Sequence, residues 1–488
     1  MTQRNLTPLG RRRRSSARLA LYVSFAVTGA AVAVLGGALD RFAPEVEVFD
    51  WRADYGADPA VDLLRRYIAI DTSLPGGDPA AGAEFVAGEV RGPGVEVTVE
   101  RVGEIEANLW AVLEGDDPRA VVLHHHVDVE PVERPEAWTR PPFEPVIEGP
   151  WLYGRGAFDM KSVGVAQIVA FRRLAEAAAA GRRPRRTVIL LATSGEETGS
   201  ELGMRFLLAA HPELVERFGF VLTEGGAVEG REHGDVKYWG TEFAQRRVLR
   251  LTVCGGDRQR LEELRRELIA EHRGWTGAEV SPEALAFLRP YAPTRDRASW
   301  RRLLGDPRRL TRDPVAFARL PGYLRSLFRN EVLPLAVVPT EGGFELPISV
   351  QLVPGADAGA VLAERMPPWR LHGLAATLYD EGAAAHGSPP AHPVLDAIAA
   401  VLGERYPGAP VGPIYLPWTI TDARFLRARG VPAYGFSPFM VLTPEVLNLA
   451  SQGTVNERIG LAGFVEGVEI YADLLERLAA GDRGRPAG

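Results

Sequence analysis

Four short segments of the sequence carry side chains that can bind a metal ion or transfer a proton. His126 and Asp128 form a His-x-Asp motif, the pair Glu196–Glu197 is adjacent, and Asp159 and Glu224 stand singly in glycine-containing segments. Imidazole and carboxylate groups are a suitable ligand set for zinc, and a carboxylate can bridge two ions about 3.5 to 4 Å apart. A carboxylate that adjoins such ligands without binding the metal can act as a general base. These segments together could form a metal site with a neighbouring carboxylate base.

Each motif also has an interpretation that involves no metal. A single His-x-Asp sequence is usually structural, and a pair of glutamates after a strand usually forms a solvated turn. A lone aspartate before a helix usually caps that helix. The predicted metal site therefore depends on a fold that brings the four segments together.

Three apolar runs, rich in β-branched and aliphatic residues, precede three of these segments directly. The runs are residues 120–123, 187–192 and 218–222. They predict buried strands, and helical patterns lie between them, including residues 162–180. This alternation predicts an α/β domain with a mostly parallel sheet. Because open α/β sheets place their sites at the carboxyl ends of the strands, the candidate ligands are expected to meet at one edge of the sheet.

The pattern of elements changes near residue 246. From there, strand-like and helix-like segments follow in the order βαββαβ, which predicts a small ferredoxin-like α+β domain. We expect this lid domain to span residues 246–383 and to contain a helical insertion near 273–329. It would interrupt a zinc-peptidase-like catalytic domain made of residues 50–245 and 384–480.

The composition is that of an ordinary globular protein with more than one domain. The chain has 488 residues, 46% of them hydrophobic and 24% charged, with a formal net charge of −7. This length exceeds what one hydrophobic core normally serves. The acidic balance and the lack of a basic stripe interleaved with aromatic residues argue against nucleic-acid binding. A single cysteine, Cys254, excludes an internal disulfide.

The N-terminal segment predicts a membrane anchor. Residues 19–39 are uncharged and mostly apolar, which is long enough to cross a hydrocarbon core of roughly 30 Å. Residues 1–18 carry six arginines, and the first acidic residue is Asp40. This asymmetry predicts a cytoplasmic N-terminus and an extracytoplasmic body. Cleavage as a signal peptide near residues 36–38, which would release a secreted form, is the alternative.

In the order and spacing of its motifs, the chain resembles the zinc-dependent family of aminoacylases, carboxypeptidases and succinyl-diaminopimelate desuccinylases. Within that family it looks most similar to the carboxypeptidase S and N-acyl-amino-acid hydrolase branch. The matching segments are His126–Val129, Trp138, Pro141–Phe143, Tyr153–Lys161, Glu196–Glu197, Glu224–Gly225, Thr421–Arg424 and Thr454–Arg458.

The resemblance implies a role for each candidate ligand. His126 and Glu224 would bind the first zinc ion, Asp159 would bridge two ions, and Glu197 would bind the second. Asp128 would orient the ring of His126 through its second nitrogen.

The resemblance also implies a general base and two substrate contacts. Glu196 would take a proton from a metal-activated water that attacks an amide carbonyl, and would then pass it to the leaving amine. Asn330 and Arg424 are expected to contact the substrate.

Three positions depart from the family pattern. Gly453 stands where the family has a histidine that binds the second zinc ion, and no histidine follows His392. A weaker oxygen ligand from Asn448, Ser451 or Gln452 would be the substitute. The segment 254–258 lacks the histidine that stabilises the oxyanion in relatives, and Gln351 stands where arginine is common. We therefore expect one firmly held zinc ion and a compromised second position.

Two hypotheses follow for function. The first is a membrane-anchored, metal-dependent hydrolase that cleaves an amide bond of a peptide or N-acyl amino acid. The resemblance is also compatible with homodimerisation through the lid domain. The second is a pseudoenzyme of the same fold that binds or scaffolds without catalysis, because three functional groups of the family are missing.

Overall fold

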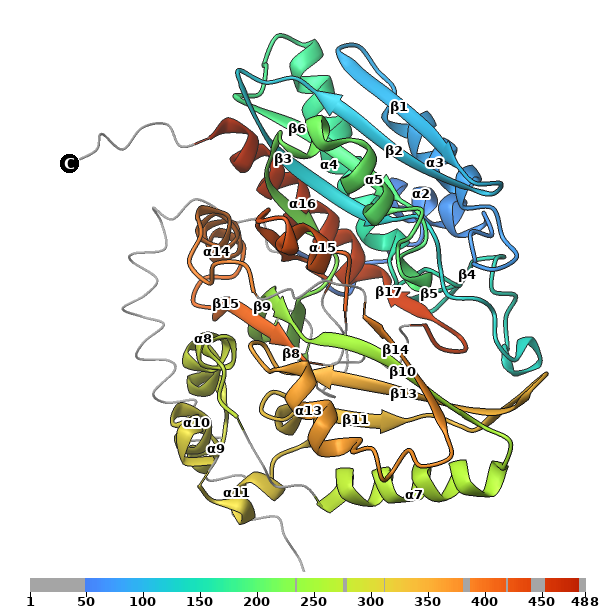
Figure 1. The fold of residues 1–488 in the computed structure, drawn as a ribbon. Coiled ribbons are helices and arrows are strands. Elements are labelled where there is room, and N and C mark those ends of the chain that lie inside the picture. The colour runs from blue at the N-terminus through green and yellow to red at the C-terminus, as the bar shows by residue number, and fades with distance from the viewer. Residues whose placement is uncertain are drawn as a thin grey trace, which may run out of the picture. The chain divides into compact units, whose positions relative to one another are not determined.

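The computed structural model describes most of the chain beyond residue 48 (Figure 1). The described residues are 49–232, 235–274, 279–310, 312–380, 387–417, 420–439 and 453–481. All of them except Phe49 belong to the compact unit Asp50–Gly488. The predicted membrane segment, residues 19–39, lies outside them, and no helix within them is both long and apolar enough to span a membrane.

A nine-stranded sheet forms the larger layer of this unit. Its strand order is β1-β2-β6-β3-β7-β16-β9-β15, and β8 pairs with β9 outside that path. The strands are β1 (Val95–Val102), β2 (Glu106–Leu113), β3 (Asp117–His126), β6 (Arg186–Thr193), β7 (Phe218–Thr223), β8 (Ala227–Glu232), β9 (Asp235–Gln245), β15 (Val411–Leu416) and β16 (Ala433–Gly435). Strands β15 and β16 follow the small domain in the chain, so two distant segments build one sheet.

The prediction of a mostly parallel sheet is confirmed only in part, because the sheet is mixed. The central strands β6, β3, β7 and β16 are parallel to one another, as expected. The pairs β1–β2, β2–β6, β16–β9 and β8–β9 are antiparallel, so the sheet is mixed. The reason lies partly in the connections: β1 and β2, like β8 and β9, are joined by short turns, and only antiparallel neighbours can be joined that way.

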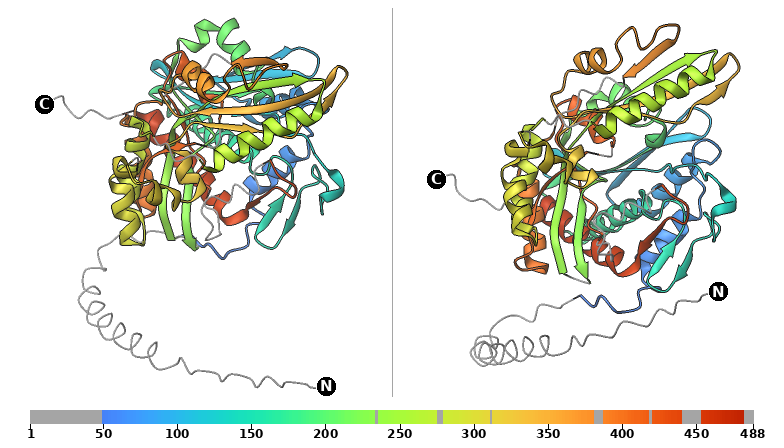
Figure 2. Two further views of the ribbon diagram at one scale, coloured as in Figure 1. Left: turned by 60° about the horizontal axis from the view of Figure 1, so that its bottom comes forward. Right: turned by 90° about the horizontal axis from the view of Figure 1, so that it is seen from below.

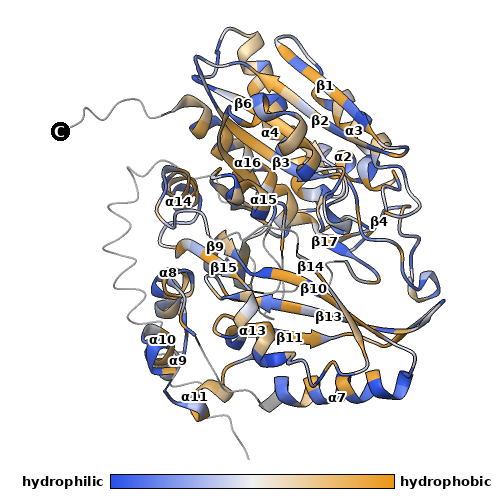
Figure 3. Cartoon of the chain, viewed as in Figure 1, coloured by the Kyte–Doolittle hydropathy of each residue, from blue (hydrophilic) through white to orange (hydrophobic). Residues whose placement is uncertain are grey.

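Helices cover both faces of this sheet (Figures 1 and 3). On one face, α5 (Met204–Ala210), α6 (Pro212–Val215) and α15 (Ala423–Ala428) pack against alternate residues of the central strands, such as Val122 and Ile189. On the other lie α2 (Pro59–Ile68), α3 (Pro79–Val90), α4 (Lys161–Ala179) and α16 (Leu461–Ala480), with α14 (Pro393–Arg405) against α16. Burial on both faces explains why β6 is apolar along nearly its whole length.

A three-stranded sheet pairs the segment before α4 with the strand that comes directly before α16. Its order is β17-β5-β4, and its strands are β4 (Val146–Glu148), β5 (Trp151–Tyr153) and β17 (Arg458–Gly460). A short helical turn, Pro135–Ala137, precedes it. Pairing of β17 with β5 brings Glu457 beside the loop that carries Asp159.

The small domain has the predicted order of elements (Figure 2). These elements are β10 (Arg247–Gly255), α7 (Arg258–Gly274), β11 (Glu331–Pro334), β13 (Gly343–Leu352), α13 (Ala358–Arg365) and β14 (Ala375–Asp380), with β12 (Val338–Thr340) added beside β13. The sheet order β11-β13-β10-β14 is wholly antiparallel and is that of a ferredoxin-like sandwich. Leucines 261, 264 and 268 of α7 lie on one helical face and pack on the sheet.

The stretch predicted as a helical insertion is helical. It contains α8 (Pro282–Tyr291), α9 (Ala298–Gly305), α10 (Pro307–Leu310), α11 (Pro314–Ala318) and α12 (Gly322–Ser326). Its helix α8 packs against β15 of the large sheet. The outer domain boundaries stay predictions.

Candidate metal centre

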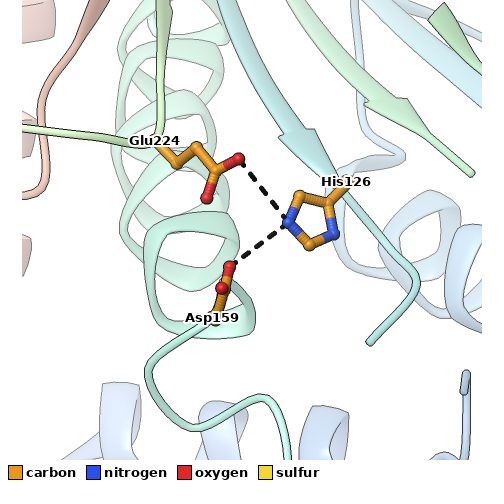
Figure 4. A group of neighbouring side chains, drawn as sticks. All are labelled: His126, Asp159 and Glu224. Carbon is orange, nitrogen blue, oxygen red and sulfur yellow. Dashed lines mark ion pairs between the residues drawn. The ribbon is translucent and has the colours of Figure 1, made fainter. Parts of the chain in front are cut away.

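His126 ends β3, and its ring is oriented so that one nitrogen is available to a metal. Its Nδ1 lies 2.9 Å from the backbone carbonyl oxygen of Asp128, which assigns the proton to Nδ1. Its Nε2 is buried and has no hydrogen-bond partner in the described structure. That nitrogen faces Oδ1 of Asp159 at 3.4 Å and Oε1 of Glu224 at 3.8 Å (Figure 4). A buried imidazole nitrogen between two carboxylates is a donor set that fits zinc.

These three residues come from three separate elements. His126 ends β3, Asp159 lies just before α4, and Glu224 follows β7. Among the residues that the structure describes, they are the one group of three His, Cys, Asp or Glu whose ligand atoms all lie within 4.8 Å of one another. The structure thus brings together the three residues expected at the first zinc position.

Glu457 holds the Asp159 loop in place. Its buried carboxylate accepts hydrogen bonds from the Nη1 atom of Arg155 at 2.8 Å and from the backbone N–H groups of Gly156, Phe158 and Asp159 at 3.1, 2.8 and 2.9 Å. Glu457 lies in the matching segment Thr454–Arg458, but its local sequence predicts no role for it, because its partners lie about 300 residues earlier in the chain.

The electrostatics of the group favour a bound cation. Burial and the nearby Asp159 raise the pKa of Glu224 to about 7, against the opposing effect of His126. Burial lowers the pKa of His126, but Glu224, Asp128 and Asp159 outweigh it and raise the pKa well above its usual value. Both shifts reflect negative carboxylates gathered around one buried imidazole. Such a cluster favours a divalent cation bound among the carboxylates.

Glu196 and Glu197 lie in a short helical turn, Glu196–Thr198, after β6. Their backbone N–H groups donate to the carboxylate of Asp128 at 3.2 and 3.1 Å. The expected role of Asp128 agrees with these contacts, because its backbone oxygen accepts a hydrogen bond from Nδ1 of His126 and its carboxylate lies 3.6 Å from the same atom. The carboxylate also anchors the glutamate turn. Arg424 donates to Oε1 of Glu196 at 3.3 Å.

The pKa values of both glutamates are raised. Burial and the charge of Glu224 raise the pKa of Glu196 well above its usual value, and Arg424 and His126 oppose that rise. Burial and Asp159 raise the pKa of Glu197. Raised carboxyl pKa values suit a group that must accept and return a proton near neutral pH.

Comparison with known proteins agrees with this geometry. The model of peptidase family M20/M25/M40 matches residues 122–477. The chain belongs to this family. The aminoacylase-1 of Homo sapiens is 30% identical over 440 residues, covering 86% of this chain and 96% of that protein. A succinyl-diaminopimelate desuccinylase of Alkalilimnicola ehrlichii is 38% identical over 157 residues, covering 28% of this chain and 40% of that protein.

The fold is likewise that of solved M20 structures. Human carnosine dipeptidase 1 superposes with a TM-score of 0.61 at 14% identity, covering 87% of this chain and 96% of that one. The predicted family, one of zinc-dependent hydrolases, is therefore confirmed.

Two residues expected to contact substrate lie in different settings. Arg424 contacts Glu196, so it borders the candidate metal centre. Asn330 precedes β11 in the small domain, and its Oδ1 atom accepts a hydrogen bond from the backbone of Val353 at 2.9 Å. Gln351 lies nearby and accepts a hydrogen bond from Arg246 at 3.0 Å. A substrate role for Asn330 stays a prediction.

Gly453, where the resemblance implies a histidine in relatives, is described, but the residues proposed to substitute for that histidine are not. Asn448, Ser451 and Gln452 lie outside the described residues. The two histidines before His126 are core residues: His124 hydrogen-bonds to threonine hydroxyls of β6 and β7, and His125 to Gln167 of α4.

Replacing Glu457 with alanine is expected to destabilise the protein by about 3–5 kcal/mol, because Arg155 would remain buried without its carboxylate. Three backbone N–H groups in the loop that carries Asp159 would also lose their acceptor. Urea unfolding measures this effect. Glu476→Ala, at an exposed position of α16, is the control and should change stability by less than about 0.5 kcal/mol. Equal unfolding midpoints for the two variants would contradict the role of Glu457.

Proposed function

We propose that this protein is a zinc-dependent hydrolase that cleaves the amide bond of a peptide or an N-acyl amino acid. One observation carries the proposal: the unpartnered Nε2 atom of His126 faces Asp159 and Glu224, with Glu196 on the neighbouring strand end. The similarity to human aminoacylase-1 supports the N-acyl amino acid class.

The residues of the site divide the chemistry between them. His126, Asp159 and Glu224 would hold zinc, which supplies a Lewis acid that polarises a carbonyl and acidifies water. Glu196 is assigned the proton transfers. It removes a proton from the attacking water and returns it to the nitrogen of the departing amine. Because Arg424 already donates to Oε1 of Glu196, the transferred proton is assigned to Oε2.

The experiment that tests this function is hydrolysis of a panel of N-acyl amino acids and dipeptides by the zinc-loaded protein. Release of a free amino acid that is abolished by chelation and restored by zinc is the expected result. Absence of turnover across the panel, with zinc still bound, would favour the alternative of a pseudoenzyme. That alternative is supported by Gly453 and by the missing histidine in segment 254–258.

We further propose that residues 19–39 anchor the protein in a membrane with its body outside the cytoplasm. The support is the uncharged apolar run and the arginines that precede it. Mass spectrometry of the mature N-terminus is the test. Retention of residues 1–18 in detergent-extracted protein is expected, and a mature chain that begins near residue 39 would show signal cleavage instead.

A further inference from the structure

The helical insertion of the small domain concentrates positive charge. Residues 289–319 contain nine arginines and three aspartates, so this stretch has a formal charge of +6, whereas the whole chain has −7. The stretch includes α9, α10 and α11, which lie at the margin of the molecule in every view (Figures 1 and 2). None of these arginines belongs to the candidate metal centre, so the proposed hydrolysis gives no reason for them.

Each of these short helices directs an apolar side chain inward. Leu304 of α9, Leu310 of α10 and Phe317 of α11 are buried. Most arginines on and between the helices are exposed. This division orients the helices, because apolar side chains gain free energy on leaving water whereas a guanidinium group keeps its hydration. The insertion therefore presents its arginines to the surroundings.

Five exposed arginines of the insertion form no ion pair with any residue that the structure describes. They make up the basic surface of the insertion and are Arg297, Arg302, Arg309, Arg312 and Arg319. Other surface arginines of the chain, such as Arg173 and Arg405, pair with acidic side chains. A cluster of unpaired guanidinium groups attracts anions, which relieve their mutual repulsion.

An apolar side chain stands among these arginines. Val315 of α11 is 63% exposed and lies three residues after Arg312 and four before Arg319. Arginines around an exposed apolar residue are typical of surfaces that bind anionic bilayers, where the guanidinium groups contact the headgroups and the apolar side chain enters the interface. A soluble polyanion would match the charge but would offer no apolar phase to Val315.

The proposed anchor would keep this surface close to a bilayer. Only residues 40–49 lie between residues 19–39 and the compact unit that begins at Asp50. Ten residues span at most about 36 Å when fully extended, whereas a compact unit of this length is roughly 55 Å across. Such a short tether raises the effective concentration of lipid at the body, so weak electrostatic contacts suffice for binding.

We propose that the basic surface of the insertion binds an anionic lipid bilayer, with Val315 at the level of the headgroups. The lipid phosphates are the anions that the guanidinium groups bind. Contact at both the anchor and the insertion would hold the body in one orientation on the membrane. This inference uses the proposed anchor but not the proposed hydrolase activity.

The experiment places a polarity-sensitive fluorophore on the insertion. Val315→Cys is labelled in a Cys254→Ser background, which removes the single native cysteine, and the full chain is reconstituted into lipid nanodiscs. The discs contain phosphatidylcholine alone or a mixture with phosphatidylglycerol. The emission is expected to shift to the blue in the anionic discs only. Added salt should reverse the shift, because salt screens contacts between exposed charges.

Two charge variants separate the insertion from the net charge of the chain. The first replaces four arginines of the basic surface and should abolish the shift: Arg302→Gln, Arg309→Gln, Arg312→Gln and Arg319→Gln. The second is the matched control, which replaces four exposed arginines of the larger domain and should keep the shift: Arg91→Gln, Arg101→Gln, Arg119→Gln and Arg182→Gln. Loss of the shift in both variants, or in neither, would overturn the inference.

Other results would also contradict lipid binding by the insertion. An equal shift in both kinds of disc would show that charge plays no part. A label that responds to soluble heparin but not to phosphatidylglycerol would assign the arginines to a polyanionic macromolecule instead. A full chain that does not enter the discs would overturn the proposed anchor and this inference with it, whereas hydrolysis of the substrate panel would be unaffected.

Discussion

Glu196→Gln is expected to lower kcat by about 10²- to 10⁴-fold while zinc content stays unchanged. The amide has nearly the same shape as the carboxylate, but it cannot accept a proton from water. Since none of the three proposed zinc ligands is altered, metal binding should survive. Paired measurements of kcat and zinc stoichiometry on the same preparation test both halves of this expectation.

The control for this variant is Glu213→Gln, at a glutamate whose side chain is 73% exposed in α6. It should retain the wild-type kcat. Equal turnover by Glu196→Gln and the wild type would show that another group acts as the base. Loss of zinc together with activity would show that Glu196 is a ligand or supports one.

His126→Ala should remove the first zinc ion and reduce hydrolysis to the background rate, because alanine leaves Asp159 and Glu224 without their nitrogen partner. A ligand that binds only the folded state stabilises it by about 2.7 kcal/mol at 100 times its dissociation constant. The wild type should therefore gain in Tm when zinc is added, and His126→Ala should not.

His372→Ala, at an exposed histidine of the small domain, serves as the control and should keep the zinc-dependent rise in Tm. A chelated wild type should resemble His126→Ala until zinc is restored. Should His126→Ala keep both its zinc and its Tm response, the first metal position would have to lie elsewhere.

Local sequence patterns were sufficient to predict the strands and helices that carry the first metal position. The apolar runs at 120–123, 187–192 and 218–222 lie in β3, β6 and β7. These strands are buried on both faces, so each reads as a continuous apolar run. Once they are parallel neighbours, their carboxyl ends must meet at one edge, and His126 and Glu224 meet there.

The same local patterns could not predict the direction of the strands at the margins of the sheet. An apolar run does not reveal whether its neighbour runs parallel or antiparallel, because side-chain alternation is the same in both. Pairing of β2 with β6 and of β16 with β9 was therefore decided by the folded chain.

The amino-acid sequence by itself determined the family, and through the resemblance it predicted the first metal ligands and the candidate base, because the order and spacing of their motifs are carried by the chain alone. Only the tertiary structure decided which groups support them. Glu457 reaches the Asp159 loop across some 300 residues of chain. The carboxylate of Asp128 likewise accepts hydrogen bonds from the glutamate turn in addition to lying 3.6 Å from His126. Contacts of this kind depend on how distant segments pack, and packing leaves no periodic pattern in the sequence.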